Sequence, residues 1–298
     1  MTVTILDGGM GRELERSGAP FRQPEWSALA LMESPQHVGM AHAAFARNGA
    51  DVITTNSYAV VPFHIGQERF EAEGLRLIDL AGRIARTTAN EFGIRVAGSL
   101  PPVMGSYRPD LFDAELARPI LETLIEGLSP HVDIWLAETQ SSLAEVTLVR
   151  QLLGDDPRPL WLSFTLDDHH AHHVLKGTEK PTLRSGETIA DATRHALALG
   201  ASALLFNCSQ PEVMEAAVRE ARTAAGDAEL AIGVYANAFA SEADDAAANE
   251  TLHGIRADLT PPLYLGWAQK WVAAGANMVG GCCGISPEHI GELAKALK

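Results

Sequence analysis

The chain has 298 residues and 46% of them are hydrophobic, which is enough apolar material for a sizeable core and excludes a disordered protein. Lysine and arginine number 23 against 38 acidic residues, and the resulting net charge of -15 argues against a nucleic-acid or anionic-membrane partner. No apolar stretch reaches the roughly 18 residues of a membrane span, and no secretory leader precedes the first apolar run, so we expect a cytoplasmic protein.

Short apolar runs alternate with longer amphipathic stretches along the chain. The runs are nearly continuous and rich in β-branched residues, which is typical of strands buried on both faces of a parallel sheet. They predict strands at 3–6, 51–55, 95–98, 132–137, 159–164, 201–206, 230–235 and 277–279. The other stretches predict helices at 35–48, 69–91, 114–128, 142–153, 187–199, 211–224, 263–274 and 287–297. We therefore expect one α/β domain over residues 1–298, a (β/α)8 TIM barrel, with a doubly wound open sheet as the alternative.

Two long insertions follow predicted strands. Residues 167–185 contain the sequence DDHHAHH, and residues 238–262 are acidic and rich in alanine. Both leave from strand C-terminal ends, where barrels place their active sites. The four histidines at 169, 170, 172 and 173 are candidate metal ligands, but a solvated loop is the preferred interpretation.

The three cysteines stand at the ends of two predicted strands. Cys208 follows the sixth, and Cys282 and Cys283 lie in the sequence GGCCG at 280–284, after the eighth. These strand ends are near neighbours in an eight-stranded barrel, so Cys208 can meet the pair. That predicts a three-thiolate metal site of the kind zinc uses when its fourth position is kept for substrate, with small buried hydrophobes as the alternative. The same cysteines make a poor disulfide framework, since adjacent cysteines rarely bridge.

Polar residues at other strand ends suggest an amino-acid pocket. Asp7 and Glu138 follow the first and fourth strands and are suited to hold an ammonium group. The amides of Gly8 and Gly9 and the hydroxyl of Thr55 could hold a carboxylate. Loop capping is the alternative role for each of these residues.

The chain resembles the zinc-dependent homocysteine S-methyltransferases in motifs spread over nearly its whole length. These motifs are DGGMG at 7–11, GADVITTNSY at 49–58, GSLPP at 98–102, Glu138-Thr139, Asn207-Cys208-Ser209 and GGCCG at 280–284. The resemblance implies a (β/α)8 barrel with Zn²⁺ on the catalytic residues Cys208, Cys282 and Cys283. It also implies a homocysteine site whose candidate residues are Asp7, Gly8, Gly9, Thr55, Glu138 and Asn207.

The resemblance further implies methyl transfer to the homocysteine thiolate, which yields methionine. The expected donor is a small sulfonium, first S-methylmethionine, then S-adenosylmethionine, with betaine third. Tyr58, Tyr235 and Trp267 could face the positive charge of the donor, with core packing as the alternative. Where the family usually continues with Pro-Asn and a glycine after strand seven, this chain has Ala236-Asn237-Ala238. The identity of the donor therefore stays open. Whether the acceptor is another thiol or a selenol, and the oligomeric state, are also left open by the sequence.

Two other functional classes remain as alternatives. A zinc-binding or thiol-sensing barrel without methyl transfer would use the same cysteines and the histidine cluster. A phosphate-binding barrel enzyme would use the glycines at the end of strand eight, but it would leave the cysteines unexplained. The acid pair Asp7 and Glu138 discriminates a methyltransferase from a sensor, because a sensor has no reason to keep an amino-acid pocket beside the metal.

Overall fold

All eight predicted strands are present and parallel in the computed structural model, which describes residues 2–239 and 256–298. Their order in the sheet is β1-β8-β7-β6-β5-β4-β3-β2, and a parallel bridge between Leu6 and Val52 joins its two edges. The sheet is therefore a nearly closed (β/α)8 barrel, and the open-sheet alternative is excluded. The strands are β1 (Thr4–Ile5), β2 (Val52–Thr54), β3 (Arg95–Leu100), β4 (Ile134–Gln140), β5 (Leu160–Phe164), β6 (Ala203–Asn207), β7 (Ala231–Tyr235) and β8 (Met278–Val279).

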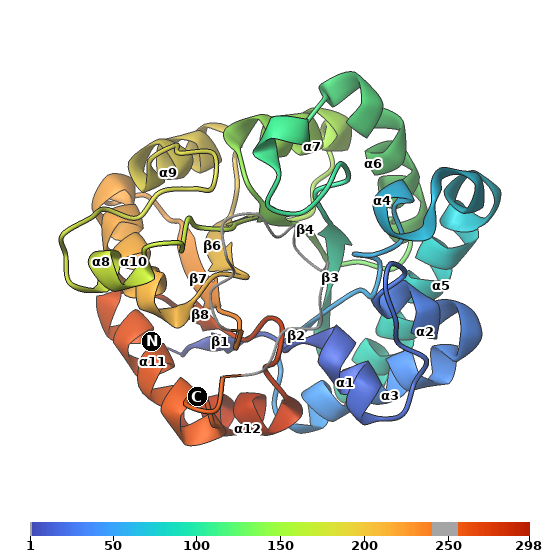
Figure 1. Cartoon of the computed structure of the whole chain (residues 1–298), viewed down its shortest axis with the longest axis horizontal. Coiled ribbons are helices and arrows are strands. Elements are labelled where there is room, and N and C mark those ends of the chain that lie inside the picture. The colour runs from blue at the N-terminus through green and yellow to red at the C-terminus, as the bar shows by residue number, and fades with distance from the viewer. Residues whose placement is uncertain (1, 240–255) are drawn as a thin grey trace.

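The helices form a ring around the strands (Figure 1). Those predicted from the amphipathic stretches are α3 (Pro35–Arg47), α5 (Gln67–Phe92), α6 (Ala114–Leu128), α7 (Leu143–Leu153), α9 (Ile189–Ala198), α10 (Pro211–Ala225), α11 (Pro261–Ala274) and α12 (Pro287–Leu297). Further short helices, for which the sequence pattern set no bounds, are α1 (Met10–Arg16), α2 (Ser27–Glu33), α4 (Pro62–Ile65), α8 (Ala171–Leu175) and η1 (Pro109–Leu111). Among the described residues, no helix is long and apolar enough to cross a membrane.

Buried apolar side chains form two clusters. The larger one packs the strands against the surrounding helices and includes Leu204, Phe206 and Trp271. The smaller one, with Leu136, Leu205 and other strand residues, fills the barrel interior and includes the Tyr235 ring at the C-terminal end of β7. The interior is thus a packed core as in other barrels, and the C-terminal ends of the strands border a cavity.

The structure describes the first insertion in full but only part of the second. Residues 167–185 contain the short helix α8, and His169, His170 and His172 are exposed, as the solvated-loop interpretation predicts. Most of the acidic insertion at 238–262 lies outside the described residues, so its expected place beside the active site stays a prediction.

At the N-terminal end of the barrel, side-chain oxygens bind the backbone of neighbouring strands. Each acceptor stands immediately before its own strand and receives an N–H from the adjacent one. This hydrogen bond connects neighbouring strand ends where the backbone hydrogen bonds between the two strands are incomplete. The pairs are Asp51 with Ile5, Asp133 with Val96 and Asn277 with Ile232, at 2.8, 2.8 and 2.9 Å.

We predict that Asp51→Ala lowers the free energy of unfolding by about 1–3 kcal/mol, because the N–H of the buried Ile5 loses its acceptor. Urea unfolding measures the change. Asp51 also pairs with Lys298 at 2.6 Å, so Lys298→Ala is the matched control that removes only this partly exposed ion pair. The control should cost at most about 1 kcal/mol. Equal losses in the two variants would contradict the proposed role of the carboxylate.

Candidate functional site

The barrel brings the three cysteines together, as the strand order predicts. Cys208 follows β6, and Cys282 and Cys283 follow β8, with β7 between them. Their three sulfur atoms lie within 4.8 Å of one another. Although Cys208 and Cys282 are 74 positions apart in the sequence, their Cα atoms are only 5.6 Å apart.

The end of β7 holds both cysteine segments through its backbone. The Cys208 N–H donates to the carbonyl of Tyr235 at 3.3 Å, and the Cys282 N–H donates to the carbonyl of Ala236 at 2.9 Å. The Cys283 carbonyl in turn accepts from the Ala238 N–H at 2.8 Å. The continuation of β7 is therefore the spacer that sets how far apart the sulfur ligands lie.

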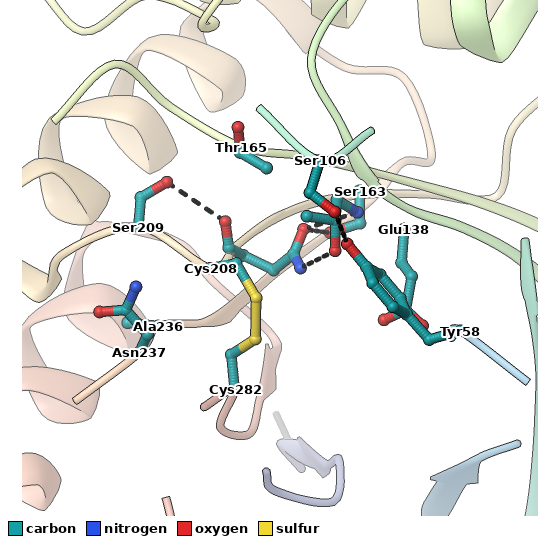
Figure 2. The surroundings of a disulfide bond; sticks show 12 residues. Tyr58, Ser106, Glu138, Ser163, Thr165, Cys208, Ser209, Ala236, Asn237 and Cys282 are labelled. Atoms are coloured by element: carbon teal, nitrogen blue, oxygen red, sulfur yellow. Dashed lines mark hydrogen bonds between the residues drawn. A yellow bond between two sulfur atoms is a disulfide. The ribbon is translucent and has the colours of Figure 1, made fainter. Parts of the chain in front are cut away.

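The sulfur atoms of Cys208 and Cys282 form a disulfide in this structure (Figure 2). The sulfur of Cys283 lies within 4.8 Å of both. This pairing departs from the expectation of a poor disulfide framework. The physical reason is that the barrel brings non-adjacent cysteines within bonding reach, whereas the expectation considered mainly the adjacent pair. When reduced, the same three sulfurs fit a metal, since closely grouped thiolates from rigid strand ends suit zinc. Because a metal needs the thiolates, disulfide and metal exclude each other at this site.

Two buried carboxylates lie near the cysteines. Asp7 accepts the Thr54 N–H at 2.8 Å, and Glu138 accepts the Ser99 hydroxyl. Burial raises the pKa of Asp7 from 3.8 to about 7, with the nearby Glu138 adding to the effect. Burial likewise raises the pKa of Glu138 from 4.5 to about 7. Each carboxyl group would ionise more readily beside a positively charged ligand.

One cavity of about 120 Å³ joins the cysteines to the acid pair. Its lining includes Asp7, Glu138 and all three cysteines, together with four aromatic side chains. Pockets for drug-sized ligands start near about 300 Å³, so this cavity suits a small molecule. The aromatic lining residues are Trp26, Tyr58, Tyr107 and Tyr235. The Tyr58 hydroxyl is hydrogen-bonded to Ser106 at 2.5 Å (Figure 2).

The predicted residues Gly8, Gly9 and Thr55 also line this cavity. A Cβ on Gly8 would lie 2.5 Å from the Ile285 carbonyl oxygen, and one on Gly9 would lie 2.6 Å from that of Cys282. Glycine is needed here because the segment after β1 packs directly against the cysteine segment. The Gly9 N–H already donates to Ile285 at 2.9 Å, so close packing is the role that the structure gives Gly9.

Asn207 has a different place from the one that the resemblance implies. Its Oδ1 accepts from the Thr139 N–H at 3.1 Å and from the Ser163 hydroxyl at 2.7 Å. Its Nδ2 donates to the Thr139 hydroxyl at 2.8 Å. Asn207 is fully buried and is not among the residues lining the cavity, so its carboxamide ties the ends of β4, β5 and β6 together.

Trp267 is not at the cavity, and the suggestion that it faces the donor is wrong. It lies on the outer helix α11, where the Lys270 ammonium stands 4.3 Å from its ring centroid. Sequence reasoning missed Trp26, Ser106 and Tyr107, which lie on connecting segments. The only available signal was that the segment after β3 leaves from the C-terminal end of the barrel.

Comparison with known proteins agrees with this geometry. A family model described as Homocysteine S-methyltransferase matches residues 4–297. Homocysteine S-methyltransferase YbgG of Bacillus subtilis is 29% identical over 98% of this chain and 93% of its own length. The metallated form of the homocysteine methyltransferase MmuM of Escherichia coli has a TM-score of 0.78 at 26% identity, covering 99% of this chain and 96% of its own. The oxidized form of MmuM has a TM-score of 0.77 at 25% identity, covering 98% and 95%.

The match of the family model spans almost the entire barrel, including every strand and the cysteine segment. It covers the same motifs that carry the resemblance in the sequence. This chain therefore belongs to the homocysteine S-methyltransferase family, whose members are methyl-transferring enzymes.

Proposed function

We propose that this protein transfers a methyl group from a small sulfonium donor, first of all S-methylmethionine, to the thiolate of homocysteine. Zn²⁺ held by Cys208, Cys282 and Cys283 is the cofactor of this proposal. The observation that carries it is that three grouped sulfurs and two buried carboxylates share one small cavity. The relatives are homocysteine methyltransferases, which supports the acceptor, and the metallated form of MmuM supports a metal.

The chain supplies a place for the ammonium group and for the thiol of homocysteine. Asp7 and Glu138 face the ammonium group, whose charge offsets the cost of ionising carboxylates in a buried site. The thiol then points to the cysteines, which line the same cavity. Zn²⁺ bound there would lower the pKa of a thiol from about 8.5, so that homocysteine reacts as the thiolate.

The transfer itself needs little further chemistry from the protein. The homocysteine sulfur forms a bond to the methyl carbon of the donor while the bond from that carbon to the donor sulfur breaks. The bonding electron pair stays on the donor sulfur, which becomes a neutral thioether, and the thiol proton passes to solvent. Holding the two reactants in line supplies much of the acceleration in such a reaction.

Three features favour a small cationic donor. The cavity is small, its carboxylates are negative when ionised, and the tyrosines Tyr58, Tyr107 and Tyr235 present aromatic surface to a positive charge. A sulfonium is also a better leaving group than a quaternary amine, so it demands less of the site. S-methylmethionine therefore ranks before S-adenosylmethionine and betaine.

A thiol-sensing barrel is the second candidate, because Cys208 and Cys282 can form a disulfide. The acid pair argues against it. A sensor needs only the cysteines, and two carboxylates with pKa values raised to about 7 have no use in it. Functional sites are where such raised pKa values concentrate.

We predict about one zinc per chain in reduced protein, and its loss in each of Cys208→Ala, Cys282→Ala and Cys283→Ala, because three thiolates are needed to hold the ion. Metal analysis after gel filtration under reductant measures it. His172→Ala removes an exposed histidine from the other candidate cluster and should keep the zinc. Full zinc in any cysteine variant would remove that cysteine from the ligand set.

We predict that zinc-loaded protein converts labelled homocysteine to labelled methionine fastest with S-methylmethionine, more slowly with S-adenosylmethionine and slowest with betaine. The ranking follows from leaving-group quality and from the size of the cavity. The label is placed in homocysteine because S-methylmethionine itself becomes methionine on losing a methyl group. Metal-free protein is the control. Turnover with betaine alone would overturn the ranking.

We predict that methionine binds more tightly as the pH rises from about 6 to about 8, by roughly tenfold for each carboxylate that must ionise to hold its ammonium group. The sign follows from the pKa values of about 7 for Asp7 and Glu138, which are mostly protonated below that pH. Methionine has no thiol, so ionisation of the ligand's own sulfur does not contribute to the calorimetric signal across this range. Glu138→Gln should weaken binding and flatten the profile. Superimposable profiles for the two proteins would refute the assignment.

A further inference from the structure

The backbone at Cys208 is held by a tyrosine from a distant segment. The Tyr107 hydroxyl donates to the Cys208 carbonyl at 3.1 Å, across 101 positions of the sequence. Cys208 has φ +49°, a left-handed conformation that non-glycine residues adopt only where contacts enforce it. Burial raises the pKa of Tyr107 well above 10, so its hydroxyl keeps its proton and remains a donor.

Tyr107 is in turn covered by an arginine from the histidine-rich insertion. The Arg184 guanidinium stacks 4.2 Å from the ring centroid of Tyr107. Its nitrogens donate to Asp168 at 2.7 Å and to the Thr165 hydroxyl at 3.1 Å. Only 13% of the Arg184 side chain and 10% of that of Asp168 are exposed, so this ion pair is largely buried and does not lie on the surface.

The same insertion also holds the residues that follow Cys208. The second carboxylate oxygen of Asp168 accepts the Gln210 N–H at 2.9 Å. The Leu166 N–H donates to the Ser209 hydroxyl at 2.8 Å. Cys208 is thus fixed through its carbonyl on one side and through the next two residues on the other.

We propose that Tyr107 and Arg184 are positioning residues for the metal-binding thiolate of Cys208. Arg184 orients the Tyr107 ring, and the Tyr107 hydroxyl holds the Cys208 carbonyl so that the sulfur faces Cys282 and Cys283. The insertion at 167–185 then also supports the metal site through Arg184 and Asp168, in addition to carrying solvated histidines. This inference rests on the proposed function, because it takes the three cysteines as the metal ligands.

The physical basis is preorganisation of the ligand set. A metal site whose ligands are already in place does not have to order them on binding. Loss of an outer contact that orients a ligand typically weakens metal binding 10- to 100-fold. Tyr107→Phe removes the hydroxyl alone and keeps the ring on which Arg184 stacks. Arg184→Lys keeps a charge for Asp168 but loses the planar stack and the rigid fork of donors.

The experiment measures the Kd of reduced protein for zinc by competition with a chelator of known affinity. We expect Tyr107→Phe to raise the Kd by about tenfold or more, and Arg184→Lys to raise it by a smaller factor. The double variant should bind no more weakly than Tyr107→Phe, because the lysine of Arg184→Lys would keep a charge beside Asp168, and what this substitution loses acts on Cys208 through the Tyr107 ring. The thermal midpoint of the metal-free protein should fall by no more than about a few degrees in any of them, because each change removes only one or two polar contacts.

Tyr58→Phe is the matched control, since it deletes a hydroxyl in the same cavity that is bonded to Ser106 and not to the cysteine segment. It should leave the zinc Kd unchanged. An unchanged Kd in Tyr107→Phe, an equal loss in Tyr58→Phe, or additive losses in the double variant would overturn the inference. A wild-type protein that binds no zinc would overturn the proposed function itself, so the two failures are distinguishable.

Discussion

The site depends on one constraint, the adjacency of β6, β7 and β8 in a parallel barrel. Parallel strands in a barrel all end at the same face, so the segments after β6 and β8 lie on either side of the end of β7. The carbonyls of Tyr235 and Ala236 then receive the N–H groups of Cys208 and Cys282. Backbone hydrogen bonds of one strand end therefore set the spacing of the sulfur atoms, independently of any metal.

This constraint also concentrates negative charge. The three cysteines, which could become thiolates once reduced, and the carboxyl groups of Asp7 and Glu138 converge on one small, largely buried cavity. Burial in this poorly solvated space is the main cause of the raised pKa values of both carboxyl groups, and at Asp7 the charge of Glu138 adds to it. A divalent cation and a ligand with an ammonium group would favour the ionised forms of these groups. The negative charge of the ionised cavity therefore complements the positive charge of the proposed metal and substrates.

The sequence predicted most of the features that follow from regular structure. The strands, their C-terminal ends, the meeting of Cys208 with the later pair, and the placing of Asp7 and Glu138 on one cavity all derive from strand order. Features that depend on the course of connecting segments were not predictable. Tyr107 was missed and Trp267 was wrongly suggested for this reason. Periodicity places a residue on a helix or strand, but it does not say where an irregular segment turns.

Backbone strain gathers at the cavity. Each non-glycine residue with positive φ in the described ranges lines it, namely Trp26, Tyr107, Thr139 and Cys208. Such conformations cost of the order of 1–3 kcal/mol each and persist only where surrounding contacts enforce them. Thr139 is held by the buried carboxamide of Asn207, which explains this asparagine without a contact to substrate. The opposite end of the barrel, where strands are tied by side-chain caps, carries no such residue among those described. The strain is thus confined to the face where ligand geometry matters, and regular hydrogen bonding elsewhere supplies the stability that sustains it.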